Sequence, residues 1–164
     1  MAVDRSIVGR STGRSRVVIE RGPVAVFADA VKDSSPVYRD PRVAQEAGYD
    51  ALPVPPTYPF VMGHFGTFPE MQPEQEAGAG GGGGSVLGPL LAKGGLLLHG
   101  EQEFEYHRPV RVGDVLSGEG RVADVYEKQS GTGTLTFVVM ETVWSDDSTG
   151  EPVVTTRTNL IVRT

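Results

Sequence analysis

The sequence contains no cysteine, few histidines and no long apolar run. The lack of cysteine excludes disulfides, thiolate nucleophiles and sulfur-ligated metal sites. The three histidines, His64, His99 and His107, do not show the spacing of metal ligands. We therefore expect no metal or other cofactor, and any chemistry must use carboxylates, hydroxyls, imidazole or backbone dipoles.

Charge and hydropathy narrow the class of partner. The chain has 15 basic and 21 acidic residues, a formal net charge of -6, and no basic cluster that would neutralise a row of phosphates. No run approaches the roughly 18 apolar residues that cross a bilayer, and the opening MAVDRSIVGRSTGRSR lacks the apolar stretch of a secretory signal. We expect a cytoplasmic protein that binds neither nucleic acid nor membrane.

A length of 164 residues with 38% hydrophobic content predicts a single domain over residues 1–164. The composition changes at about 71–89, where the run GAGGGGGS occupies 78–85. Glycine loses much backbone entropy on folding and gains no side-chain contact. We interpret 71–89 as a mobile surface loop, because it lacks the Lys-Ser/Thr ending of a phosphate-binding loop.

The first half of the chain is predicted to contain helices. Residues 20–32 place Val24, Phe27, Ala28 and Val31 at helical spacing. Asp40 is a candidate cap for a second helix that begins at Pro41 and ends near Gly48. The segment LPVPPTYPFVMGHFGTF at 52–68 starts extended because of its prolines, and its apolar run then predicts a buried helix.

The second half alternates with a period of two, which predicts strands. In LLLHGEQEFEYHR at 96–108, one face carries Leu98, Gly100, Gln102, Phe104 and Tyr106, and the other carries His99, Glu101, Glu103, Glu105 and His107. The acidic side chains are explained by a solvated face that also protects a sheet edge. Three more long segments follow with short turns, which is typical of an antiparallel meander, and RSRVVIE at 14–20 adds a strand.

The predicted fold class is α+β, with a long antiparallel sheet of about five strands wrapped around a central apolar helix, which is the hot-dog architecture. The segments IVGR, FADAVKDSSPVYRDPRVAQEAGY, PPTY and HGEQEFEYHRPVRVGDVL occur in that order. In these segments the chain resembles the MaoC-like hydratase/dehydratase family, in particular its FAS1-like dehydratase branch, over nearly its whole length.

The resemblance implies a catalytic loop with the pattern Asp-x-Asn-Pro-x-His. There, a bend at Pro brings a carboxylate and an imidazole toward one water, which adds to the β-carbon of an enoyl thioester. In this sequence Asp33 takes the acid position, Ser35 replaces Asn, Pro36 keeps the bend, and Tyr38 stands at the His position. A phenol with its usual pKa of about 10 would need a shift of roughly 3 units to replace the imidazole.

Asp33 and Tyr38 are therefore the candidate catalytic pair, and Thr57, Tyr58 and His99 are candidate substrate contacts. Each has a plainer interpretation: Asp33 as a loop carboxylate, Tyr38 as a buried phenol, Tyr58 as a packed ring, and His99 as a solvated or interface side chain. Phe60, Val61, Phe65 and Phe68 would either pack in the core or border an acyl channel. At the start of the buried helix, Pro55 and Pro56 replace the His-Gly of active members and remove N–H groups that could bind an oxyanion.

The resemblance is closest to the non-catalytic subunits of two-subunit (3R)-hydroxyacyl dehydratases. It implies an acyl-CoA or acyl-ACP thioester as the ligand and a second hot-dog chain that carries the Asp and His. A heterodimer is favoured over a homodimer. The alternatives are a self-sufficient homodimeric hydratase or thioesterase, and a module that binds acyl thioesters without turnover. The carrier, the acyl group and the partner's identity stay open.

Overall fold

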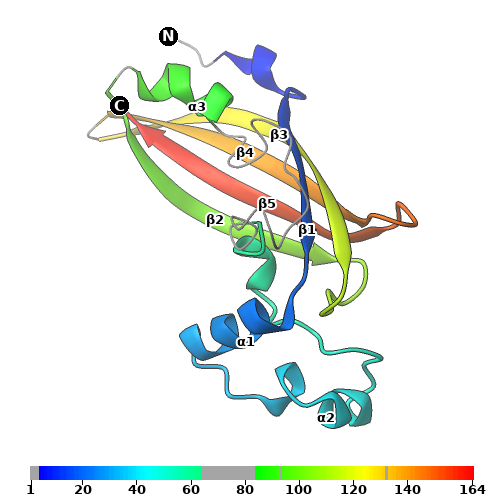
Figure 1. The fold of residues 1–164 in the computed structure, drawn as a ribbon. Helices are drawn as coiled ribbons and strands as arrows, with labels where there is room; N and C mark the ends of the chain where they lie inside the picture. Colours follow the sequence, from blue (N-terminus) through cyan, green and yellow to red (C-terminus); the bar gives the residue numbers. More distant parts are fainter. Residues whose placement is uncertain (1–3, 64–83, 93, 132) are drawn as a thin grey trace.

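The computed structural model describes residues 4–63, 84–92, 94–131 and 133–164. Their dominant feature is one five-stranded antiparallel sheet (Figure 1). The strands are β1 (Ser11–Val18), β2 (Leu96–Tyr106), β3 (Val115–Ser130), β4 (Gly133–Asp146) and β5 (Pro152–Arg163). Their order across the sheet is β1-β3-β4-β5-β2, so β1 and β2 form the two edges. The predicted α+β class and all five predicted strands are confirmed.

The described residues also form three short α-helices: α1 (Arg21–Ala30), α2 (Pro41–Glu46) and α3 (Gly84–Leu91). Single 3₁₀ turns lie at Arg5–Ile7, Pro36–Tyr38 and Tyr58–Phe60. Figure 1 shows α1 and α2 beyond one end of the sheet and α3 near the other. Among the described residues, no helix is both long and apolar enough to cross a lipid bilayer.

The first two helices form largely as predicted. In α1, Val24 and Ala28 are fully buried and Phe27 packs against the core, whereas Val31 lies beyond the helix end and is 47% exposed. Asp40 caps α2 by accepting a hydrogen bond from the Arg42 amide at 2.9 Å, and Pro41 occupies the first helical position.

The predicted buried helix and loop require two corrections. Within 52–63 the described chain is extended and then makes only the 3₁₀ turn Tyr58–Phe60, because Pro53, Pro55, Pro56 and Pro59 supply no N–H for a helix. Residues 64–68, the rest of that predicted helix, lie outside the described residues, as do 71–83 of the predicted loop. From Gly84 onward the chain forms α3, although 84–89 was predicted to be loop.

Two apolar clusters hold these elements to the sheet. One lies at the α1 end and includes Ile19, Tyr58, Met62, Leu116 and Trp144. The other lies at the α3 end and consists of Val86, Leu87, Val122, Val125, Val138 and Val162. Burial of Val86 and Leu87 in the second cluster explains why α3 forms despite its glycines and Pro89, since packing outweighs weak helix propensity.

The motif RPVRVGD at 108–114 forms a tight turn that joins three parts of the chain. Val54 donates to the Val110 carbonyl at 3.1 Å, and Val112 donates to the Leu52 carbonyl at 2.9 Å, which fixes the segment before the 3₁₀ turn. Ile19 and the turn exchange two further backbone hydrogen bonds, which fix the segment between β1 and α1. The turn thus positions both loops that carry candidate site residues.

Candidate active site

The loop between α1 and α2 makes the bend that the sequence predicted. The Asp33 amide donates to the Ala28 carbonyl at 2.9 Å, and the Asp33 carboxylate accepts from the Ser35 amide at 3.1 Å. Pro36 then starts the 3₁₀ turn that ends at Tyr38. A side-chain hydrogen bond across two residues before a proline is a common way to fix such a turn. The loop therefore has a defined shape, with both candidate catalytic residues on it.

Asp33 and Tyr38 come together, as predicted from their spacing. Burial raises the pKa of the Tyr38 hydroxyl above its usual 10, and the charge of Asp33 and a hydrogen bond to Asp33 raise it further. A phenol with a raised pKa keeps its proton at neutral pH and donates a hydrogen bond to the neighbouring carboxylate. This pair can donate a hydrogen bond or a proton, but the phenol cannot accept a proton from water as an imidazole does.

Tyr106 also lies in this region, and the sequence had placed it only on the core face of a strand. Its hydroxyl donates to the Pro56 carbonyl at 2.7 Å. Burial raises the pKa of Tyr106 to about 12, and the charge of Tyr38 adds to the increase. The end of β2, the proline segment and the Asp33–Tyr38 loop therefore meet at one place. The sequence signal was a phenol on the predicted core face of the strand; in the structure Tyr106 is 39% exposed, and its hydroxyl is held by the Pro56 carbonyl.

The start of the predicted central helix is occupied by Thr57 and Tyr58. Thr57 is exposed, and its side chain does not cap the 3₁₀ turn. Tyr58 is only 1% exposed, and its ring packs edge-on against Phe27 with 5.5 Å between centroids. This burial supports the packing interpretation of Tyr58, whereas Thr57 keeps a hydroxyl accessible to a ligand.

Burial raises the pKa of Tyr58 to about 12, which gives a testable pH dependence. A raised folded-state pKa means that the phenol's contribution to stability is complete below pH 10 and is lost as the pH rises toward 12. At pH 11 the loss amounts to about 1.4 kcal/mol. Urea unfolding at pH 8 and pH 11 should show a smaller pH-dependent loss for Tyr58→Phe than for the wild type. Equal losses in both proteins would contradict this assignment.

His99 lies on a different face of the sheet from the one predicted. A bulge between His99 and Glu101 shifts the register, so that His99 pairs with Leu160 while Glu101 pairs with Asn159. The His99 ring packs edge-on against Phe60 with 5.4 Å between centroids, and its Nε2 lies 3.4 Å from the Gln102 side-chain oxygen. His99 therefore projects from the core face, not from the face of the acidic side chains, because the extra residue reverses the alternation.

The arrangement pairs a carboxylate with a phenol donor where the family pattern has an imidazole, next to an apolar surface. Phe60 is 47% exposed beside His99, which gives an apolar surface next to an imidazole. Within the described ranges, no three His, Asp or Glu side chains gather closely enough to hold a metal ion. His64 lies outside those ranges, and so do Phe65 and Phe68.

Comparison with known proteins gives a family match over most of the chain. Residues 6–156 match the family described as "FAS1-like, dehydratase domain region". A UPF0336 protein of Thermobifida fusca is 33% identical over 167 residues, which span 99% of this chain and 95% of that protein. A probable enoyl-CoA hydratase alpha subunit of Thermomonospora curvata is 32% identical over 164 residues, which span 94% of this chain and 49% of that protein.

The fold also matches a solved complex. The C-terminally truncated HadBC (3R-hydroxyacyl-ACP dehydratase) complex of Mycobacterium tuberculosis contains a chain that superposes with a TM-score of 0.69. The match covers 98% of this chain and 99% of that chain at 23% sequence identity, and it confirms the hot-dog fold. The family match over residues 6–156 shows that the chain belongs to the FAS1-like dehydratase family.

Proposed function

We propose that this chain is a subunit of an (R)-specific enoyl-thioester hydratase or 3-hydroxyacyl-thioester dehydratase. A hot-dog partner would supply the Asp and His that activate water, and this chain would shape the channel for the acyl group. The observation that carries the proposal is the protonated phenol of Tyr38, hydrogen-bonded to Asp33, at the position where the family pattern has an imidazole.

The chemistry explains why that substitution matters. Hydration requires a base that takes a proton from water as its oxygen attacks the β-carbon, and an acid that delivers a proton to the α-carbon. Imidazole and carboxylate together perform both steps near neutral pH. In this chain the raised pKa of Tyr38 keeps the phenol in its donor form, so the first step has no base at residue 38.

One surface of this chain is suited to bordering an acyl channel. Phe60 and His99 meet on the core face next to edge strand β2, and Gln102 of the same strand continues this surface. If a partner's sheet joined β2, these side chains would border the junction between the two chains. They would contact the acyl group, while the thioester carrier and the reacting carbons would lie toward the partner's dyad.

The relatives support both the chemistry and the shared site. One is called a probable alpha subunit of an enoyl-CoA hydratase, and the solved neighbour is a complex of a 3-hydroxyacyl-ACP dehydratase. We carry over from them the reaction class and the need for a second chain. The carrier of the thioester, CoA or acyl carrier protein, stays open between these two.

Co-expression tests the proposal. The partner should be a hot-dog relative that retains Asp-x-Asn-Pro-x-His, sought first in the adjacent reading frames. We expect the two chains to co-purify and to hydrate crotonyl-CoA or its acyl-carrier-protein equivalent, with little activity from this chain alone. Hydration by this chain alone would indicate a self-sufficient enzyme. Saturable acyl-thioester binding without turnover in any mixture would indicate a binding module.

His99 gives a second test in the same complex. Replacing His99 with Ala should raise KM for the thioester severalfold with a smaller change in kcat, because it removes a contact equally present in the ground and transition states. His107, just after the opposite end of β2 and bonded to Thr155 at 3.0 Å, provides a control whose replacement should leave KM unchanged. A fall in kcat with constant KM after His99→Ala would contradict a binding role.

A further inference from the structure

Edge strand β2 presents a row of carboxylates on the face opposite the core. Glu101, Glu103 and Glu105 are all exposed, and no Lys or Arg occurs within Leu96–Tyr106. We call these three side chains the acidic face of β2. Leu96, Leu97 and Leu98 at the start of the strand are 58%, 40% and 41% exposed. A long free edge with exposed apolar side chains needs a partner or a device that limits self-association.

The acidic face ends a row of charges that crosses four strands. Arg121, Glu141, Arg157 and Glu103 are consecutive cross-strand partners on β3, β4, β5 and β2. The Arg157 guanidinium contacts three carboxylates: Glu141 at 2.7 Å, Glu103 at 2.8 Å and Glu105 at 2.9 Å. Arg121 also pairs with Glu141 at 2.7 Å, so two guanidiniums share three carboxylates and negative charge is in excess at the sheet edge.

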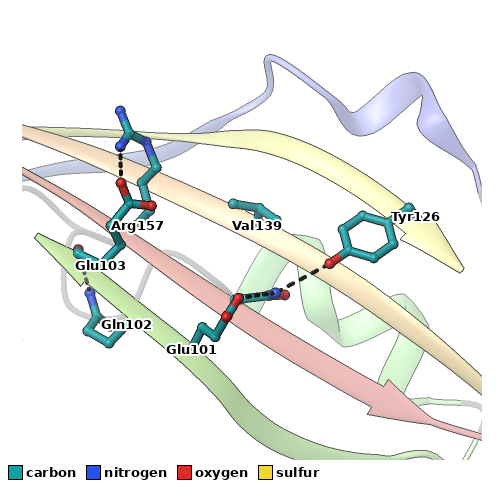
Figure 2. A pocket seen from close by; sticks show the side chains of 7 residues that line it. Glu101, Gln102, Glu103, Tyr126, Val139 and Arg157 are labelled. Atoms are coloured by element: carbon teal, nitrogen blue, oxygen red, sulfur yellow. Dashed lines mark hydrogen bonds and ion pairs between the residues drawn. The ribbon is translucent and has the colours of Figure 1, made fainter. Parts of the chain in front are cut away.

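A hollow of about 450 Å³ adjoins the acidic face. Figure 2 shows Glu101, Glu103, Tyr126, Val139 and Arg157 around it. The side-chain nitrogen of Asn159 lies 3.4 Å from both Glu101 and the Tyr126 hydroxyl. The Asn159 side-chain oxygen is buried and has no donor among the described residues. The exposed carboxylate of Glu101 on the lining of this hollow fits the ammonium or guanidinium of a long basic side chain.

The other sheet edge has no such excess. On β1, Arg14 pairs with Glu119 at 2.9 Å and Arg16 pairs with Asp147 at 2.6 Å. Each arginine of β1 therefore has its own carboxylate within the chain. The excess of negative charge is a feature of β2 and not of β1.

We infer that the acidic face of β2 selects the partner chain: it accepts a hot-dog edge strand with Lys or Arg on its outward face, and it disfavours a second copy of this chain. The inference rests on the proposed function only in taking the partner to be a hot-dog relative. An antiparallel pair of two β2 strands would place two rows of Glu opposite each other, and like charges directly opposite are destabilising. A basic strand would instead neutralise the surplus.

The test uses the chain itself as the probe. In the double variant Glu101→Lys/Glu105→Lys, β2 becomes a basic edge while Glu103 keeps its bond to Arg157. Sedimentation should show that an equimolar mixture of wild type and this variant associates at least about tenfold more tightly than wild type alone, and that high salt removes the difference. The variant Glu46→Lys/Glu151→Lys carries the same charge change at exposed positions away from β2 and should not associate with the wild type.

A neutral variant keeps the inference testable if the charge-reversal variant does not fold. Glu101→Gln/Glu105→Gln should self-associate at least about tenfold more tightly than the wild type, because only repulsion is removed. Equal self-association of the wild type and the neutral variant, or no association in the mixture, would overturn the inference. Catalytic co-complexes that form regardless of these charges would overturn it too, yet leave the proposed function intact. If pairing depends on these charges but no complex hydrates the thioester, the inference is supported and the proposed function is contradicted.

Discussion

In a mixed complex with an active hot-dog partner, Asp33→Asn and Tyr38→Phe in this chain should change kcat by no more than about twofold. Removing the imidazole from the partner's Asp-x-Asn-Pro-x-His should lower kcat by about 10²–10⁴-fold, the usual contribution of a positioned acid–base group. The asymmetry follows from the protonated state of Tyr38, since only the partner would then hold an imidazole base for water. Steady-state hydration of crotonyl-CoA by the purified complexes measures both effects.

Tyr49→Phe serves as the control for this experiment, because Tyr49 is a second phenol close enough to influence Tyr38. The complex with Tyr49→Phe should have the kcat of the wild-type complex. If it does, loss of a neighbouring hydroxyl does not by itself disturb the loop, and any change after Tyr38→Phe can be assigned to Tyr38. A drop of a hundredfold after Tyr38→Phe, with normal assembly, would mean that the phenol takes part in the chemistry of the complex.

Replacing Asp114 with Ala should destabilise the isolated chain by about 3 kcal/mol. The Asp114 side chain is 9% exposed and accepts from the Arg108 guanidinium at 2.7 Å and from the Arg111 amide at 2.9 Å. Arg108 also contacts Asp146 at 3.1 Å. Removing the carboxylate leaves the Arg111 amide without its acceptor and takes from the partly buried Arg108 guanidinium one of its two carboxylates, which costs more than a surface ion pair. Urea unfolding at neutral pH measures the loss.

Asp50→Ala provides the matched control in the same cluster. Asp50 pairs with Arg111, but its side chain is 75% exposed and its ion pair is screened by solvent, so its loss should cost clearly less than the loss of Asp114. Equal destabilisation by the two replacements would show that the 108–114 turn does not depend on its buried carboxylate. Because this turn holds the Pro53 and Ile19 segments, a destabilised Asp114→Ala should also assemble less well with a partner.

The strands could be predicted because each is a long alternating segment bounded by turn residues. The face of His99 could not be, since a bulge adds one residue without any change in composition and reverses the side chains on one side of it. The row of charges from Arg121 to Glu103 could not be predicted from the sequence either, because it depends on the register of four strands, β2 to β5.

The helical regions show how packing and proline override local pattern. The apolar run after Leu52 predicted a helix, yet its four prolines limit the described part to a single 3₁₀ turn. The glycine-rich composition predicted a loop through 89, yet Val86 and Leu87 find a buried site against the sheet and α3 forms. The Asp33–Tyr38 contact was predictable because it depends on local spacing and a single proline.

The most direct test of the account is the turnover of an enoyl thioester by the pure chain, measured beside its Tyr38→Phe variant. We predict that neither protein hydrates crotonyl-CoA measurably above the uncatalysed rate, because no group at residue 38 can accept the proton of water at neutral pH. Steady hydration by the wild type that disappears in Tyr38→Phe would contradict the central claim that the base belongs to a partner chain.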